Sequence, residues 1–132
     1  MMRVLIVEDE ALVAMEIEGM LEIAGHDATG MADDLESAVA AAEADRPDLA
    51  LVDINLARGC SGLDVAAALK ARGVPVMFAT GNCASDSGRG LAMGCLHKPI
   101  TDSTLAAAIA AAAAVLGGGR PQRLPASLHF YD

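Results

Sequence analysis

Four groups of residues capable of chemistry stand where short apolar segments of this sequence end. They are Glu8-Asp9 after residues 3–7, Asp53 after residues 49–52, Thr80 after residues 75–79, and Lys98 after residues 94–97. Because the carboxyl ends of parallel strands converge on one crevice, we expect these side chains to meet there. Carboxylates about 4 Å apart would repel by roughly 4 kcal/mol per pair at an effective dielectric near 20. Since Lys98 supplies only one opposing charge, the set predicts a hard cation with oxygen ligands, and Mg²⁺ suits it best.

Asp53 is the candidate nucleophile at this predicted site. Its carboxylate can attack phosphorus and form an aspartyl phosphate. The hydroxyl of Thr80 and the ammonium of Lys98 would hold the oxygens of the transferred group, because phosphoryl transfer depends on positioning and charge neutralisation. Gly81, which has no side chain, leaves room for that group.

Each of these residues also has an ordinary structural explanation. Acids such as Glu8 and Asp9 can stabilise a helix N-terminus, and an Asp such as Asp53 is a common turn residue. A threonine often ends a strand, and a lysine is usually a solvated charge. Their coincidence at four strand ends favours one shared site over four separate explanations.

An alternation of apolar strands and amphipathic helices must position these residues. Strands are predicted at residues 3–7, 26–31, 49–52, 75–79 and 94–97, and helices at residues 10–24, from Asp33 or Asp34 to 44, 62–71 and 101–116. This order is typical of an α/β domain whose parallel sheet is covered by helices on both faces. The glycines between residues 81 and 94 predict a loop or a frayed helix, because glycine costs about 1 kcal/mol at each interior helical position.

The composition favours one domain and excludes several partners. Nine basic and eighteen acidic residues give a net charge of −9, which opposes direct binding to nucleic acid or to anionic membranes. The longest apolar run, residues 105–116, is shorter than the roughly twenty residues that span a bilayer, and the first residues lack a signal-peptide cleavage site. Cys60, Cys83 and Cys95 show no metal-like spacing and are predicted to be reduced thiols of a cytoplasmic protein.

The segments around the predicted site resemble those of bacterial response-regulator receivers, the CheY-like domains. The matching segments are residues 4–10 (VLIVEDE), 51–56 (LVDINL), 78–81 (FATG) and 98–99 (KP), and the resemblance covers about residues 2–117. It implies a flavodoxin-like (βα)5 three-layer sandwich with a parallel five-stranded sheet of order 2-1-3-4-5. It also implies a receiver domain at residues 1–117 and a C-terminal tail at residues 118–132 with no effector domain.

The resemblance assigns roles to the site residues. Asp53 would be the phosphoacceptor, and Asp9 and Asp53 would bind Mg²⁺ directly. Glu8 would support the ion through water, and the backbone carbonyl of Asn55 would be a further ligand. The lifetime of the phosphorylated state would depend on Asn55 and Asn82.

Residues 78–81 are more narrowly similar to the single-domain receivers called the FAT GUY group, which act in bacterial stress and phosphorelay signalling. The resemblance implies a cis peptide bond between Lys98 and Pro99. One departure is Cys95, which stands three residues before Lys98, where many receivers carry Tyr or Phe. We therefore expect the signal from Thr80 to pass through the Gly-rich segment 81–94 instead.

The function implied by the resemblance is that of a signalling protein and not an enzyme. It would accept a phosphoryl group on Asp53 from a histidine kinase or phosphotransfer protein and signal by conformational change to a protein partner. The uncharged, alanine-rich helix at residues 104–116 predicts contact with a partner or, as a homodimer, with a second copy. The aromatic residues of the tail are interpreted either as disordered or as docked on this or another molecule.

Three other functions fit the residues less well. Haloacid-dehalogenase phosphatases need an Asp-x-Asp-x-Thr pattern, which Asn55 and Ala57 break. A flavodoxin-like FMN carrier needs hydroxyls and amides in its first loop, where the acids at residues 8–10 would repel the phosphate. A degenerate receiver acting as a phosphorylation-independent docking module stays open, because Cys95 replaces the aromatic residue.

Overall fold

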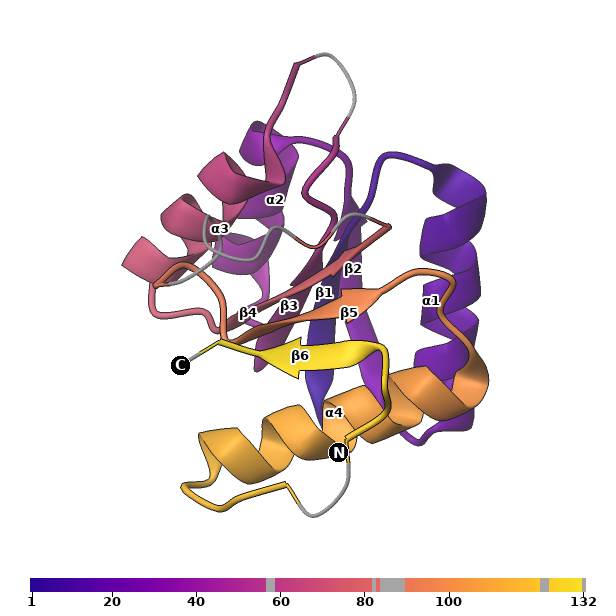
Figure 1. The fold of residues 1–132 in the computed structure, drawn as a ribbon. Coiled ribbons are helices and arrows are strands. Elements are labelled where there is room, and N and C mark those ends of the chain that lie inside the picture. Colours follow the sequence, from indigo (N-terminus) through magenta and orange to yellow (C-terminus); the bar gives the residue numbers. More distant parts are fainter. Residues whose placement is uncertain (57–58, 82, 84–89, 122–123, 132) are drawn as a thin grey trace.

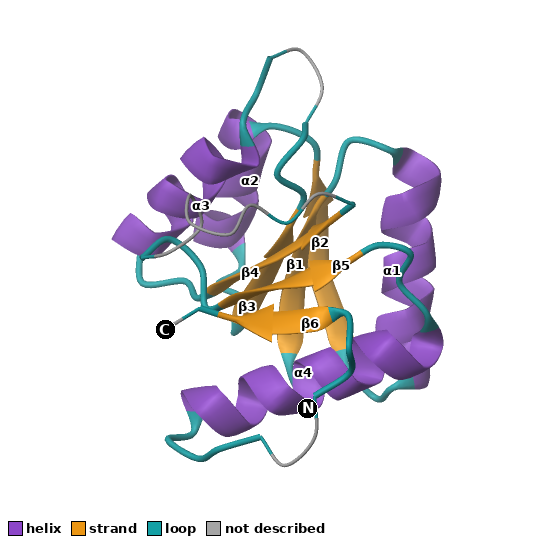
Figure 2. Ribbon diagram, viewed as in Figure 1, coloured by secondary structure: helices purple, strands orange, loops and turns teal. Residues whose placement is uncertain are grey.

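The computed structural model describes every residue of the chain except 57–58, 82, 84–89, 122–123 and 132. A six-stranded sheet lies between helices on its two faces (Figures 1 and 2). The strands are β1 (Arg3–Val7), β2 (Asp27–Ala32), β3 (Leu49–Val52), β4 (Val76–Thr80), β5 (Gly94–His97) and β6 (Leu128–Phe130). The helices are α1 (Ala11–Ile23), α2 (Leu35–Ala44), α3 (Gly62–Ala71) and α4 (Asp102–Leu116).

The sheet has the order β2-β1-β3-β4-β5-β6. The first five strands are parallel, so the predicted order 2-1-3-4-5 is confirmed. Crossover helices connect most of these parallel neighbours, as parallel pairing requires. The predicted count of five strands is wrong by one, because β6 pairs antiparallel with β5 at the end of the sheet.

The sixth strand comes from the C-terminal tail. Of the two interpretations of the tail aromatics, docking on the same molecule is the one that the structure supports, because Gly94 pairs with Phe130. A Cβ added at Gly94 would lie 2.6 Å from the carbonyl oxygen of His129, so the absence of a side chain permits this close approach. Phe130 packs against one core of the sheet and Tyr131 against the other.

Two apolar cores lie on the two faces of the sheet. Helices α1 and α4 cover one face, where Ile6, Ile17 and Ile109 are buried together. Helices α2 and α3 cover the other, where Val65 and Phe78 are buried. Successive side chains of a strand point to opposite faces, so a strand covered on both sides is apolar throughout. This explains why the continuous apolar runs of the sequence are central strands.

Side chains mark the starts of three helices. Asp34, Ser61 and Thr101 each accept a hydrogen bond from a backbone N–H of the following first turn. Such caps satisfy N–H groups that the helix itself leaves without partners. Among the helices of the described ranges, none has both the length and the apolar character needed to cross a membrane.

The prediction that all three cysteines are reduced is wrong for two of them. Cys83 and Cys95 form a disulfide, with their Cα atoms 6.1 Å apart, whereas Cys60 is free. The sequence separation of 12 residues gave no recognisable motif, but the return from β4 to β5 brings the two side chains together. Most of the predicted loop or frayed helix in this connection, residues 84–89, lies outside the described residues.

Gly62 begins α3 against the chain that leaves β3. A Cβ added there would lie 2.0 Å from the backbone oxygen of Asp53 and 2.5 Å from the Cα of Ile54. We predict that Gly62→Ala lowers the free energy of unfolding by about 1–3 kcal/mol, measured by urea denaturation. Gly19→Ala in α1 is the matched control, because nothing lies within 4 Å of its added Cβ. It should raise stability by about 1 kcal/mol or less, and equal effects of both substitutions would contradict the account.

Candidate functional site

Four strand ends bring the predicted site residues to one edge of the sheet. Glu8 and Asp9 follow β1, Asp53 follows β3, Thr80 ends β4 and Lys98 follows β5. Parallel pairing sets these ends at one level, because Val7 lies opposite Val52 in the register. Beside them, the backbone N–H of Lys98 donates to the carbonyl of Thr80 at 2.9 Å. The convergence expected from the sequence is therefore present in the fold.

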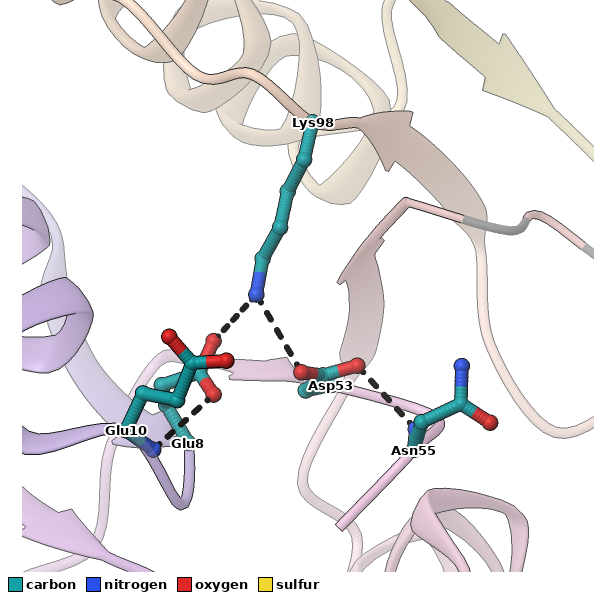
Figure 3. A network of polar contacts seen from close by, with 5 residues as sticks. All are labelled: Glu8, Glu10, Asp53, Asn55 and Lys98. Carbon is teal, nitrogen blue, oxygen red and sulfur yellow. Dashed lines mark hydrogen bonds and ion pairs between the residues drawn. The ribbon is translucent and has the colours of Figure 1, made fainter.

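Lys98 connects two carboxylates from different strands (Figure 3). Its Nζ lies 2.5 Å from Oε1 of Glu8 and 3.2 Å from Oδ2 of Asp53. Both carboxylate residues are almost fully buried, with exposed fractions of 4% for Glu8 and 7% for Asp53. One ammonium thus holds two buried acids in a fixed position at the edge of the sheet.

Backbone N–H groups hold the same two carboxylates from the other side. The N–H of Asn55 donates to Oδ1 of Asp53 at 3.0 Å, and the N–H of Glu10 donates to Oε2 of Glu8 at 3.2 Å. The first is an Asx-type turn, a pattern that the Asp-x-Asn segment after an apolar strand could have indicated from the sequence. Glu10 occupies the N-cap position of α1, yet its side chain makes no capping hydrogen bond. Helix capping therefore does not explain Glu10.

Three carboxylates form the cluster that could hold a metal ion. Oxygens of Glu8, Asp9 and Asp53 all lie within 4.8 Å of one another, and no other such group occurs within the described ranges. An all-oxygen set that keeps an open side suits Mg²⁺, which binds through one or two carboxylates, waters and phosphate oxygens. The donor chemistry of these residues therefore fits the ion expected from the sequence.

The remaining predicted residues lie around this cluster or outside the described chain. Thr80 is buried, with 1% of its surface exposed. A Cβ added at Gly81 would meet no atom within 4 Å, so there is open space beside it. The peptide bond between Lys98 and Pro99 is cis. Asn82 lies outside the described residues, so its predicted effect on the lifetime of the phosphorylated state is not placed by the geometry.

A comparison with protein families identifies the fold and its site together. The family model described as "Response regulator receiver domain" matches residues 4–110. The chain belongs to this family. It is therefore a receiver of two-component signalling, as the resemblance of the site segments indicated.

Two curated proteins illustrate the relatives of this receiver. The chain is 49% identical over 79 residues to "Phyllosphere-induced regulator PhyR" of Methylorubrum extorquens, a match that covers 58% of the chain and 30% of PhyR. It is 36% identical over 115 residues to "Transcriptional regulatory protein PdtaR" of Mycobacterium tuberculosis, covering 81% of the chain and 54% of PdtaR. The chain thus spans about half or less of the length of these relatives.

Solved structures of similar fold include other receivers. The signal receiver domain of a modulated diguanylate cyclase from Desulfovibrio desulfuricans G20 has a TM-score of 0.73 and 36% identity, covering 83% of this chain and 91% of that one. The response regulator PhyR from Brucella abortus has a TM-score of 0.72 and 35% identity, covering 82% of this chain and 46% of that one. The likeness again concerns the receiver part of longer proteins.

Burial and Lys98 set the protonation of the receiver's site in opposite directions. Burial raises the pKa of Glu8 to about 7, although the hydrogen bonds from Lys98 and from the N–H of Glu10 oppose this shift. Burial lowers the pKa of Lys98, but the hydrogen bond to Glu8 and the charges of Asp53 and Glu8 outweigh it and leave the pKa raised. Without a metal ion, Lys98 therefore stays charged while Glu8 titrates near neutral pH.

The raised pKa of Glu8 predicts a pH dependence of stability in the metal-free receiver. Between the ordinary carboxyl pKa of 4.5 and about 7, the folded protein binds a proton that the unfolded chain does not. The resulting stabilisation is complete below the lower value and is lost as the pH rises through the higher one. We predict that the free energy of unfolding falls over this range by roughly 1–3 kcal/mol more in the wild type than in Glu8→Gln.

Urea denaturation in EDTA at a series of pH values measures this difference. Asp27→Asn, a substitution in the exposed edge strand β2, is the control and should follow the wild type. Parallel curves for the wild type and Glu8→Gln would show that Glu8 does not titrate as described.

Proposed function

We propose that this receiver is a Mg²⁺-dependent phosphorylation switch whose phosphoacceptor is Asp53. The observation that carries the proposal is the position of the Asp53 carboxylate, which is 7% exposed and lies 3.2 Å from the ammonium of Lys98. It also lies within the cluster of oxygens from Glu8 and Asp9. A buried acid that served only the fold would not need two further acids around it, because their mutual repulsion costs stability.

Mg²⁺ would be held by the carboxylates of Asp9 and Asp53, with Glu8 supporting it and the backbone carbonyl of Asn55 as a further ligand. The bound ion would neutralise negative charge on the transferred phosphoryl group. Lys98 by itself offers one positive charge to three carboxylates, so an added divalent cation brings the site close to balance. An open space at Gly81 leaves room for the incoming group.

The phosphoryl donor would be a histidine kinase or a phosphotransfer protein. A carboxylate oxygen of Asp53 forms a bond to phosphorus, while the bond from phosphorus to the donor nitrogen breaks and its electron pair stays on that nitrogen. Lys98 and Thr80 would then hold oxygens of the transferred group. Because Lys98 already lies between Glu8 and Asp53, it needs only a small displacement to contact the new phosphoryl oxygens.

The output of the switch is proposed to be a change of conformation that a protein partner recognises, in the cytoplasm. Solved relatives include "Anti-anti-sigma factor PhyR" from Bartonella quintana, of which this chain covers 45%. A partner such as an anti-sigma factor is thus one candidate, reached through the receiver surface alone. The net charge of −9 disfavours nucleic acid or membranes as direct targets. A homodimer would use the alanine face of α4, since β6 already occupies the edge of β5.

The second candidate function is a degenerate receiver that docks partners without phosphorylation. The observation in its favour is the disulfide at Cys95, the position where many receivers carry a switch aromatic. The acid cluster and Lys98 favour phosphorylation over this alternative, because a docking module would have no need to keep them.

We predict that incubation with Mg²⁺ and acetyl phosphate adds one phosphoryl group, detected by intact-mass spectrometry. Asp53→Asn should abolish the adduct, because the amide is not a nucleophile of this kind. Asp27→Asn, at the far end of the sheet, should be labelled like the wild type. EDTA should prevent labelling of every form. An unmodified wild type, or an adduct that survives in Asp53→Asn, would favour the docking module.

A further inference from the structure

Cys83 and Cys95 lie on either side of the segment that would transmit the signal. Cys83 stands three residues after Thr80, and Cys95 stands three residues before Lys98. Their disulfide therefore links the chain leaving β4 to the strand that carries Lys98. A covalent bond thus connects the neighbourhoods of two residues that contact the proposed phosphoryl group.

The disulfide is the second of two ties across β4 and β5. The first is the hydrogen bond from the N–H of Lys98 to the carbonyl of Thr80, at 2.9 Å. Cys95 also lies directly beside Phe78 of β4 in the parallel register, and both are fully buried in the core under α2 and α3. With the disulfide closed, the segment from Thr80 to Cys83 is held at both of its ends.

We infer that Cys83 and Cys95 form a reversible thiol–disulfide site whose oxidation restrains the segment after Thr80 and slows phosphorylation of Asp53. The inference rests on the proposed function, because the restraint acts on the residues that would receive the phosphoryl group. Its substrates are a dithiol reductant and, in the reverse direction, a disulfide oxidant. Redox state would then act as a second input to the receiver.

The burial of the two sulfur positions defines the order of the exchange. Cys83 is only partly buried, whereas Cys95 is 0% exposed, so an external thiolate attacks the sulfur of Cys83. The bond between the two cysteines breaks, and the Cys95 sulfur leaves as a thiolate and takes up a proton. The second thiol of the reductant attacks the mixed disulfide and releases Cys83, so two electrons pass to the pair and the reductant becomes a disulfide.

Reduction leaves a small thiol at position 95, in place of the aromatic that many receivers use to couple the site to the surface. Phosphorylation would then move the segment after Thr80 instead of an aromatic side chain. Cys60 is free and lies in the connection between β3 and α3, so it takes no part in this restraint. It serves as the matched control cysteine.

The first test needs no phosphorylation. Amide hydrogen exchange is measured at Thr80 and Gly81 in the air-oxidised protein and in the same protein reduced with dithiothreitol. Exchange should be roughly tenfold faster after reduction, because a closed loop of this length restrains local opening. Cys83→Ser should match the reduced wild type, and Cys60→Ser should behave like the wild type in both states. Equal exchange rates in the two states, or alkylation of both Cys83 and Cys95 without reductant, would overturn the inference.

The second test measures labelling by acetyl phosphate and Mg²⁺ in both redox states. The oxidised protein should be labelled roughly tenfold more slowly than the reduced protein and than Cys83→Ser. Equal labelling in both states would overturn the redox input and leave the phosphorylation switch in place. If neither state is labelled, the proposed function fails, and the exchange rates at Thr80 and Gly81 still decide whether the disulfide restrains the segment.

Discussion

Two almost fully buried carboxylates, on Glu8 and Asp53, share a single cation, the ammonium of Lys98. Removing charges from water is expensive unless they are paired and hydrogen-bonded. The pairing here is incomplete, because the carboxylate of Asp9 adds a third negative charge to the same cluster. The raised pKa of Glu8 is the physical sign of this imbalance. A site with this deficit of positive charge is prepared to gain from a divalent cation, and that property unites the metal and the phosphoryl chemistry proposed for it.

Much of the site could be predicted because it depends on regular parallel strands. An apolar run buried on both faces has a recognisable end, and the residue after it must lie at the shared edge of the sheet. Asp53 and Lys98 could therefore be placed near each other without coordinates. What the pattern could not supply is pairing between individual atoms. The sequence gives no sign that Lys98 approaches Glu8 more closely than Asp53, since side-chain length and burial decide that contact.

The two features that were predicted wrongly or left open depend on contacts between distant segments. The disulfide joins Cys83 to Cys95 only because the chain folds back between neighbouring strands, and the spacing of the cysteines carries no local signature. The three-residue strand β6 is too short for a periodic pattern. It forms because Gly94 permits a close approach on an otherwise open edge strand. Both features act on the side of the sheet that would carry the signal outward.

The central claim is that the carboxylates are kept for a cation and not for the stability of the fold. The most direct measurement is the free energy of unfolding of the wild type and Asp9→Asn, in EDTA and at saturating Mg²⁺. The account predicts that Asp9→Asn is at least as stable as the wild type in EDTA, because one repelling charge is gone. With Mg²⁺ the wild type alone should gain, by about 1–3 kcal/mol, because the ion binds only the folded protein. A variant that is less stable in EDTA and gains as much from Mg²⁺ as the wild type would contradict the claim.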